Sequence, residues 1–254
     1  MQNAALEALG MSDEWNYDAI EVSAQEFPER IAGLPDLGYV GVNVTIPHKS
    51  LALEVADESS SAVTAIGASN TLIFSDGKVR AENTDAAGVL EATPERARSG
   101  RTLILGAGGV SRAAVWALCG AGSEVHVWNR SPERAEELVT TLTVDGSSPK
   151  AISADEARVG SFDLIVNCTA VGMPGRDEDP FDVLPINRDA LGGNVVLDLV
   201  YSGVETRLVA EAALAGADAI GGLESLVRQG AESFRLWTGM EPPLDVMRSA
   251  AAVD

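Results

Sequence analysis

Short apolar runs alternate with longer amphipathic stretches along the chain from residue 101 onward. Each run is too short to form a helix and is bounded by glycine or polar residues, which is typical of a buried parallel strand. The strands predicted in this way are residues 102–105, 125–128, 162–168, 194–200 and 219–220. The helices predicted between or after them are residues 111–119, 132–142, 206–215 and 223–237. This alternation predicts an α/β fold in which helices cover a parallel, doubly wound sheet.

The first part of the chain shows the same alternation with shorter elements. Strands are expected at residues 17–22 and 39–46, and a hairpin over 71–81 has its turn at Asp76 and Gly77. The helices expected here are residues 3–9, 24–32, 50–65 and 86–92. Because strands and helices alternate in this part too, it also predicts a parallel sheet covered by helices.

A glycine-rich turn joins the strand at 102–105 to the helix at 111–119. Such a turn lets the backbone approach a pyrophosphate, whose charge the N-terminus of the following helix stabilises. An ordinary strand-to-helix turn is the alternative, but a strand precedes the glycines, a helix follows, and a second strand comes at the expected distance. The sequence therefore predicts a dinucleotide site, formed by Gly106, Ala107, Gly108, Gly109, Val110 and Ser111.

The end of the second strand indicates which dinucleotide is bound. An NAD site usually carries an acidic residue there, whereas an NADP site carries arginine near the 2′-phosphate. This chain has Asn129, Arg130 and Ser131, followed by Arg134. Guanidinium groups and short polar donors suit a phosphate better than a bare ribose, so NADP is predicted. The alternative is that both arginines are solvated surface charges.

Composition narrows the possible partners. A formal net charge of −20 over 254 residues argues against nucleic acid and anionic membranes, because both require basic patches. The two histidines and two cysteines show no metal-ligand spacing, so no metal is expected. No apolar run approaches the roughly 20 residues needed to span a membrane, and the start lacks a signal-peptide pattern. We expect a soluble protein of the reducing cytoplasm that binds a small molecule.

Three polar clusters interrupt the apolar runs before the glycine-rich turn. They are residues 43–49, which end in Lys49, residues 70–71 and residues 83–85. Each cluster taken alone is typical of a turn or a helix cap. Three of them ahead of a cofactor domain favour a substrate site, and Lys49 is one of only three lysines in the chain.

In these motifs the chain resembles the shikimate dehydrogenase family, NADP-dependent enzymes that reduce 3-dehydroshikimate to shikimate in chorismate and aromatic amino-acid biosynthesis. The matching segments are NVTIPHK (43–49), GASNT (67–71), NTDAAG (83–88), GAGGVSRA (106–113), NRSPERA (129–135), NCTAVGM (167–173), DLVY (198–201) and GGLESLVRQGAESFRLWTG (221–239). The resemblance implies a substrate domain (1–88), a Rossmann-type NADP domain (89–222) and C-terminal helices (223–254) that return to the substrate domain. The active site is then expected in the cleft between the domains, in a monomer or a homodimer.

The resemblance also implies roles for individual residues. Lys49 and Asp85 would be the catalytic pair. The substrate would contact both of them together with Thr45, Asn70, Tyr201 and Gln229. The nicotinamide half of NADP would lie near Thr169, Met173, Leu199 and Gly222. An ammonium group can stabilise and then protonate the oxygen of a ketone that accepts hydride, so Lys49 is either a proton donor or mainly an electrostatic clamp.

One departure from the family pattern concerns the start of the chain. Family members begin with a strand and a Ser-x-Ser loop that binds the substrate carboxylate, and Met1 lies after the position of that loop. We therefore expect the functional chain to begin upstream of Met1. Two other activities remain open, a dehydrogenase for quinate or a related ring acid and a catalytically impaired NADP-binding module.

Overall fold

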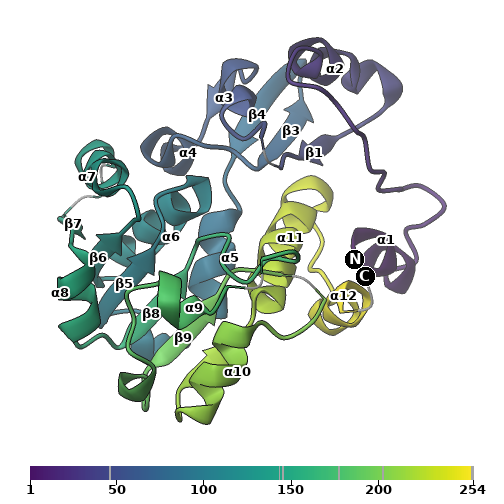
Figure 1. Ribbon diagram of the computed structural model, residues 1–254. Helices are drawn as coiled ribbons and strands as arrows, with labels where there is room; N and C mark the ends of the chain where they lie inside the picture. Colours follow the sequence, from purple (N-terminus) through teal and green to yellow (C-terminus); the bar gives the residue numbers. More distant parts are fainter. Residues whose placement is uncertain (46, 143, 145, 177, 202, 253–254) are drawn as a thin grey trace.

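The computed structural model describes residues 1–254 except 46, 143, 145, 177, 202 and 253–254, and each of its two lobes contains one sheet (Figure 1). The smaller sheet has the spatial order β1 (Gly41–Asn43), β3 (Thr71–Ser75), β4 (Lys78–Glu82) and β2 (Glu58–Ser59). The larger sheet has the order β10 (Asp218–Ile220), β9 (Val195–Asp198), β8 (Leu164–Asn167), β5 (Arg101–Leu105), β6 (Glu124–Trp128) and β7 (Lys150–Ala151).

The larger sheet confirms the predicted doubly wound fold. All its strands pair in parallel, and the central strand β5 leads into the glycine-rich turn. Counted along the chain its strands lie in the order 3-2-1-4-5-6, which is the order of dinucleotide-binding domains. Two buried apolar clusters, one on each face, hold helices against it. The helices of this lobe are α6 (Gly109–Gly120), α7 (Pro132–Thr141), α8 (Ala154–Val159), α9 (Pro180–Val183) and α10 (Arg207–Leu214).

In the smaller sheet the predicted parallel arrangement is wrong. Strand β3 runs antiparallel to both β1 and β4, and only β2 and β4 are parallel. The hairpin between β3 and β4 is confirmed, with Asp76 at φ 52° and Gly77 at φ 72°, the backbone of a type I′ turn. The strand expected at 17–22 does not form. Both backbone groups of Tyr17 are bonded to the side chain of Asn3 instead, at 2.8 and 2.9 Å.

The single helix expected over 50–65 is also wrong. Two short helices, α3 (Leu51–Glu54) and α4 (Ser61–Ile66), flank strand β2. The reason is local polar chemistry. The Asp57 carboxylate accepts the backbone N–H of Val79 at 2.8 Å, which ties the chain to β4, and Ser60 then caps α4 through the N–H of Val63.

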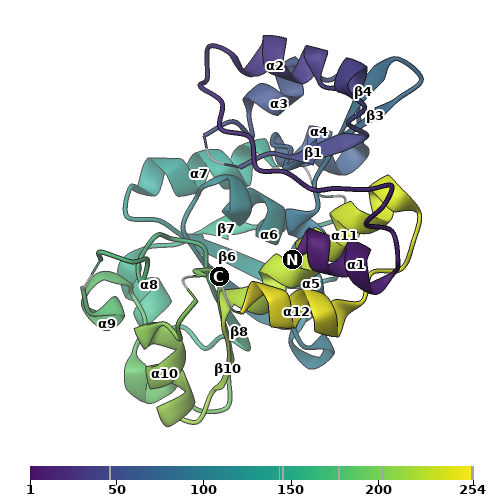
Figure 2. The ribbon, with the colours of Figure 1, turned by 90° about the vertical axis from the view of Figure 1, so that its right-hand side faces the viewer.

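Helices α5 (Asp85–Ala92) and α11 (Gly222–Thr238) lie side by side between the lobes (Figures 1 and 2). They approach closely at Gly88, where an added Cβ would lie 2.8 Å from the carbonyl oxygen of Ser225. Helix α11 also packs with α1 (Gln2–Ala8) and α12 (Leu244–Ala251) around a buried apolar cluster (Figure 2). Helix α2 (Phe27–Gly33) and short 3₁₀ turns at Pro35–Leu37, Glu95–Ala97 and Arg188–Ala190 complete the described elements. No helix among the described residues is both long and apolar enough to cross a membrane.

Candidate active site

The glycine-rich turn has the geometry of a ligand cradle. Gly106 has φ 112°, and an added Cβ there would lie 3.2 Å from the backbone of Cys168, so only glycine fits. At Gly108 and Gly109 an added Cβ would meet nothing within 4 Å, which leaves the backbone open to a ligand. The buried Ser111 hydroxyl accepts the N–H of Gly108 at 3.1 Å and fixes the turn onto the first residues of α6.

The polar residues after β6 lie at the same sheet edge, because β5 and β6 are parallel neighbours. Asn129 donates its side-chain amide to the carbonyl of Ser131 at 3.0 Å, and Arg130, Ser131 and Arg134 are exposed. Within the described part of the chain, neither arginine forms an ion pair. Both guanidinium groups are thus available to an anionic ligand beside the glycine-rich turn.

Two loops at the carboxyl ends of β8 and β9 are held by a buried polar pair. Asn167 accepts the backbone N–H of Thr169 at 3.0 Å and donates to the Asp198 carboxylate at 2.8 Å. Asp198 also accepts the N–H of Val200 and the hydroxyl of Thr206. Burial raises the pKa of Asp198, and these hydrogen bonds counteract that rise. Thr169 and Leu199 are therefore fixed near the turn, whereas Met173 is 46% exposed.

All six residues predicted to contact the substrate line one cavity of about 420 Å³ between the lobes. Three residues predicted for the cofactor, Val110, Leu199 and Gly222, line the same cavity. The other residues predicted for the cofactor lie outside it, along the sheet edge. The remaining lining residues are Met1, Gln2, Asn3, Tyr17, Asn43, Val44, Ser225 and Leu226.

Lys49 and Asp85 form an ion pair at one side of this cavity. The Lys49 ammonium is 2.5 Å from Oδ2 of Asp85, and their side chains are 22% and 12% exposed. Asp85 is the first residue of α5, where the helix dipole favours a carboxylate. The ion pair thereby holds the lysine side chain at the cavity wall, where an ammonium can stabilise a developing negative charge.

Two amide side chains, those of Asn70 and Gln229, continue the hydrogen-bond network from this ion pair along the cavity wall. Asn70 donates to Oδ1 of Asp85 at 3.0 Å and to the side-chain oxygen of Gln229 at 3.2 Å. Its own side-chain oxygen accepts the backbone N–H of Thr84 at 2.7 Å, which fixes the orientation of the amide. The Tyr201 hydroxyl donates to the carbonyl of Ala251, so its bond goes to α12. The Thr45 side chain is exposed at the mouth of the cavity.

Sequence reasoning missed Tyr17 and Asn43, which the structure places in the same wall. The Tyr17 hydroxyl donates to Oδ1 of Asn43 at 3.0 Å, and partial burial raises the pKa of Tyr17. Asn43 begins the NVTIPHK segment, so its position in that motif was a usable signal. Tyr17 has no such signal, because the sequence of residues 17–22 predicts only a strand.

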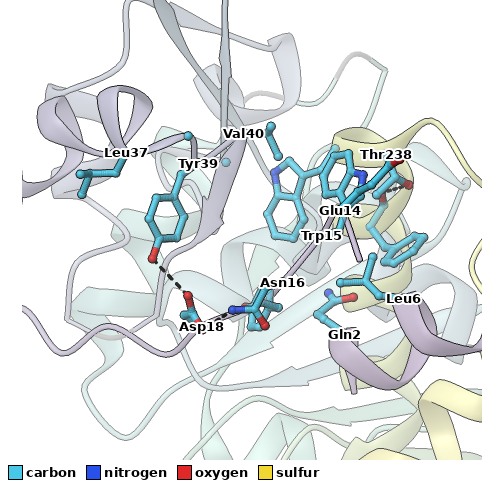
Figure 3. Close-up of a pocket in the computed structure, with 15 residues that line it drawn as sticks. Gln2, Leu6, Glu14, Trp15, Asn16, Asp18, Leu37, Tyr39, Val40 and Thr238 are labelled. Atoms are coloured by element: carbon cyan, nitrogen blue, oxygen red, sulfur yellow. Dashed lines mark hydrogen bonds between the residues drawn. The ribbon is translucent and has the colours of Figure 1, made fainter. Parts of the chain in front are cut away.

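Two further cavities adjoin the site through Tyr17. The first, about 490 Å³, lies between α1, β1 and the end of α11, and Gln2 and Tyr17 line both it and the substrate cavity. Figure 3 shows its polar side, where Tyr39 and Asn16 both donate to Asp18, at 3.3 and 2.6 Å. The second, about 380 Å³, lies between residues 16–22 and β1. Among the described strands, β1 pairs with β3 alone, so its other edge faces this second cavity.

The strand order, the glycine cradle and the charged polar cavity beside it together define a nicotinamide-dinucleotide-dependent oxidoreductase. Family models match three segments of the chain: a shikimate dehydrogenase substrate binding domain over residues 1–72, shikimate / quinate 5-dehydrogenase over 89–199, and a shikimate 5′-dehydrogenase C-terminal domain over 222–252. The chain belongs to the shikimate dehydrogenase family.

Individual relatives agree with this assignment. Shikimate dehydrogenase (NADP(+)) of Methanothermobacter thermautotrophicus is 41% identical over 98% of this chain and 89% of its own length. A crystal structure of the Thermus thermophilus shikimate 5-dehydrogenase with NADP(H) and shikimate is 37% identical, with a TM-score of 0.84 over 98% of this chain and 91% of its own. A quinate dehydrogenase of Corynebacterium glutamicum with NAD is 27% identical, with a TM-score of 0.83 over 98% and 91%.

Proposed function

We propose that this protein catalyses the reversible, NADP-dependent reduction of 3-dehydroshikimate to shikimate. The single observation that carries the proposal is the shared cavity, in which the Lys49–Asp85 pair faces residues of the glycine cradle and of the β9 loop. A ring substrate in this cavity would lie between the charged pair and the cofactor. The activity named for the relatives is the activity that this arrangement can perform.

The residues present fit NADP. The open backbone at Gly108 and Gly109 suits a pyrophosphate at the N-terminus of α6. Asn129, Arg130, Ser131 and Arg134 would hold the 2′-phosphate, since Asn129 stands where an NAD site usually has an acid. Thr169, Met173, Leu199 and Gly222 would border the nicotinamide half. When bound, the reduced cofactor supplies the hydride for the ketone.

In this proposal Lys49 and Asp85 serve the carbonyl that is reduced. The Lys49 ammonium lies in the cavity wall and would stabilise negative charge on the carbonyl oxygen, then give that oxygen a proton from Nζ. Asp85 keeps the ammonium in place and can accept a hydrogen bond from a substrate hydroxyl. Asn70, Gln229, Thr45 and Tyr201 would contact the remaining groups of the ring.

Several finer points stay predictions. The domain boundaries at 88 and 222, the cytoplasmic location and the choice between monomer and homodimer are among them. A quinate dehydrogenase is the nearest rival, because a quinate enzyme shares the fold. The structure named for it contains NAD, however, and the basic strand end here favours NADP.

A direct assay tests the proposal. Purified protein is mixed with NADP and shikimate, and the reduced cofactor is followed by its absorbance, with quinate and NAD in parallel. We expect the largest kcat/KM for the pair shikimate and NADP. Faster turnover of quinate would favour the rival activity, and NADP binding without turnover of either acid would identify an impaired NADP-binding module.

A further inference from the structure

Three hydroxyl groups meet in the buried junction behind the substrate cavity. They belong to Thr71 on β3, Thr84 just before α5 and Ser233 on α11, and their side-chain oxygens lie 3.0 to 3.2 Å apart. The three residues are 0%, 1% and 0% exposed. We call this group the hydroxyl triangle. It joins strand β3 of the small sheet to the two helices between the lobes.

Each corner of the triangle is attached to an amide side chain that lines the cavity. The Asn43 amide nitrogen donates to Ser233 at 2.8 Å and to Thr71 at 3.1 Å. The Asn70 amide nitrogen donates to Thr84 at 2.9 Å, and the Thr84 hydroxyl lies 3.4 Å from the side-chain oxygen of Gln229. Asn43, Asn70 and Gln229 all line the cavity, whereas the triangle itself does not.

The hydrogen-bonding capacity of a hydroxyl explains why the triangle orients these amides. A hydroxyl donates one hydrogen and accepts two. Even if every hydroxyl hydrogen stays within the triangle, each oxygen keeps on average one further lone pair, and only a donor can fill it. The Ser233 hydroxyl also lies 3.1 Å from the carbonyl oxygen of Gln229, and a donation there leaves one more lone pair open. The N–H side of Asn43 and of Asn70 must then face the triangle, and the side-chain oxygen of Asn43 is left for Tyr17.

The orientation of the Asn70 amide also affects the ion pair of Lys49 and Asp85. With one hydrogen directed to Thr84, its nitrogen directs another to Oδ1 of Asp85, and Oδ2 of Asp85 holds Lys49. Loss of a hydroxyl would leave buried amide hydrogens without an acceptor, and the amide would turn to find one. Asp85 would then lose the hydrogen bond that the Asn70 amide donates to its Oδ1.

We propose that the hydroxyl triangle of Thr71, Thr84 and Ser233 is a positioning element that sets the amide orientation in the substrate cavity and hence the affinity for a polyhydroxylated ring. This inference rests on the proposed function for its substrate. The three residues position the amide groups of Asn43 and Asn70 without touching the ring or the cofactor themselves.

Matched variants at Thr71 separate the hydroxyl from the methyl group. Thr71→Val keeps the shape and removes the hydroxyl, whereas Thr71→Ser keeps the hydroxyl. Thr102→Val is the control for general stability, because Thr102 is equally buried and its hydroxyl bonds to Ser123 at 2.6 Å in the other lobe. If Thr71→Val does not fold, Ser233→Ala replaces it in every measurement.

We expect Thr71→Val to raise the KM for shikimate at least about fivefold, the lower range for an unpaired buried polar group. Thr71→Ser and Thr102→Val should stay near the wild-type KM, and the Kd for NADP should not change in any variant. Equal losses in Thr71→Val and Thr71→Ser would overturn the inference in favour of packing. An equal loss in Thr102→Val would overturn it in favour of general destabilisation.

A second measurement does not depend on turnover. In NMR spectra the side-chain amide signals of Asn43 and Asn70 should move in Thr71→Val and stay in place in Thr102→Val. Unmoved amide signals in Thr71→Val would overturn the inference even if the protein is active. Absence of shikimate turnover in the wild type would contradict the proposed function instead, and the amide signals would still test the triangle.

Discussion

At the residue scale, Lys49 is the most direct test of the chemistry. Lys49→Ala should lower turnover about 10²- to 10⁴-fold, the usual range for a positioned acid or base, because the carbonyl oxygen loses its cation and proton source. NADPH binding, followed by its fluorescence, should not change. The matched control is Lys78→Ala, whose ammonium pairs with Glu58 on the surface. Near-normal turnover of the Lys49 variant would remove this residue from the mechanism.

Arg130 tests the choice of cofactor. Arg130→Ala should weaken NADPH binding roughly 10- to 100-fold, because a charge-assisted phosphate contact contributes about 1.5 to 3 kcal/mol. NADH binding should change little, since NADH has no 2′-phosphate. Titration calorimetry with both cofactors makes the comparison, and Arg158→Ala on α8 is the control arginine. Equal losses for NADPH and NADH would refute a phosphate contact.

Cys119 gives a prediction for alkaline pH. Burial raises the pKa of its thiol to about 11. Between pH 9 and 11 the unfolded chain loses this proton while the folded chain keeps it, so the free energy of unfolding falls as pH rises, by about 1.4 kcal/mol per unit from this group. The effect is absent at neutral pH. In urea unfolding at several pH values, Cys119→Ala should lose about 2 to 3 kcal/mol less over this window. Parallel pH curves for the two proteins would contradict the prediction.

At the element scale, the site depends on how closely α5 approaches α11. Gly88→Ala adds a Cβ that would lie 2.8 Å from a carbonyl oxygen and 2.9 Å from Cβ of Gln229, so the helices must separate. Because α5 carries Asp85 and α11 carries Gln229, we expect a higher KM for shikimate and a loss of about 1 to 3 kcal/mol in stability. Gly120→Ala is the control, because its Cβ would meet nothing within 4 Å. A Gly88 variant as stable and active as this control would rule out the close approach as a requirement.

The elements also show how far sequence reasoning reaches. The four inner strands of the large sheet, β5, β6, β8 and β9, were predictable because each is a largely apolar run that is buried on both faces. The edge strand β7 was not predicted, because Lys150 and Ala151 form no apolar run. Residues 17–22 mix apolar residues with Asp18 and Glu21, and a strand also requires a neighbour to pair with. The Asn3 side chain bonds to the backbone groups of Tyr17 instead. The motifs identified Lys49, Asp85, Asn70 and Gln229, and the structure places all four in one cavity. The motifs contain no information about partners that are distant in the sequence, such as Tyr17.

At the scale of the whole molecule, we expect the net charge to lower the stability of the fold. A net charge of −20 makes the folded chain repel itself, and salt screens that repulsion as the Debye length falls from about 10 Å at 0.1 M to about 3 Å at 1 M. We expect sodium chloride to raise the stability by at least about 1 kcal/mol over this range, or roughly 2 to 4 °C in Tm. Thermal scans followed by circular dichroism measure this directly. A Tm that is flat or falls with salt would show that self-repulsion does not limit the fold.

Among the described strands, β1 has one edge without a partner, and the net charge also affects contacts at this edge. Alternate backbone groups of Gly41 and Asn43 face away from β3, and such an edge is a template on which a strand from another copy can add. Long-range repulsion between highly charged copies keeps these edges apart at low ionic strength. Salt that raises the conformational stability of each molecule therefore also screens the repulsion between copies. As the ionic strength rises, conformational stability should increase while colloidal solubility decreases.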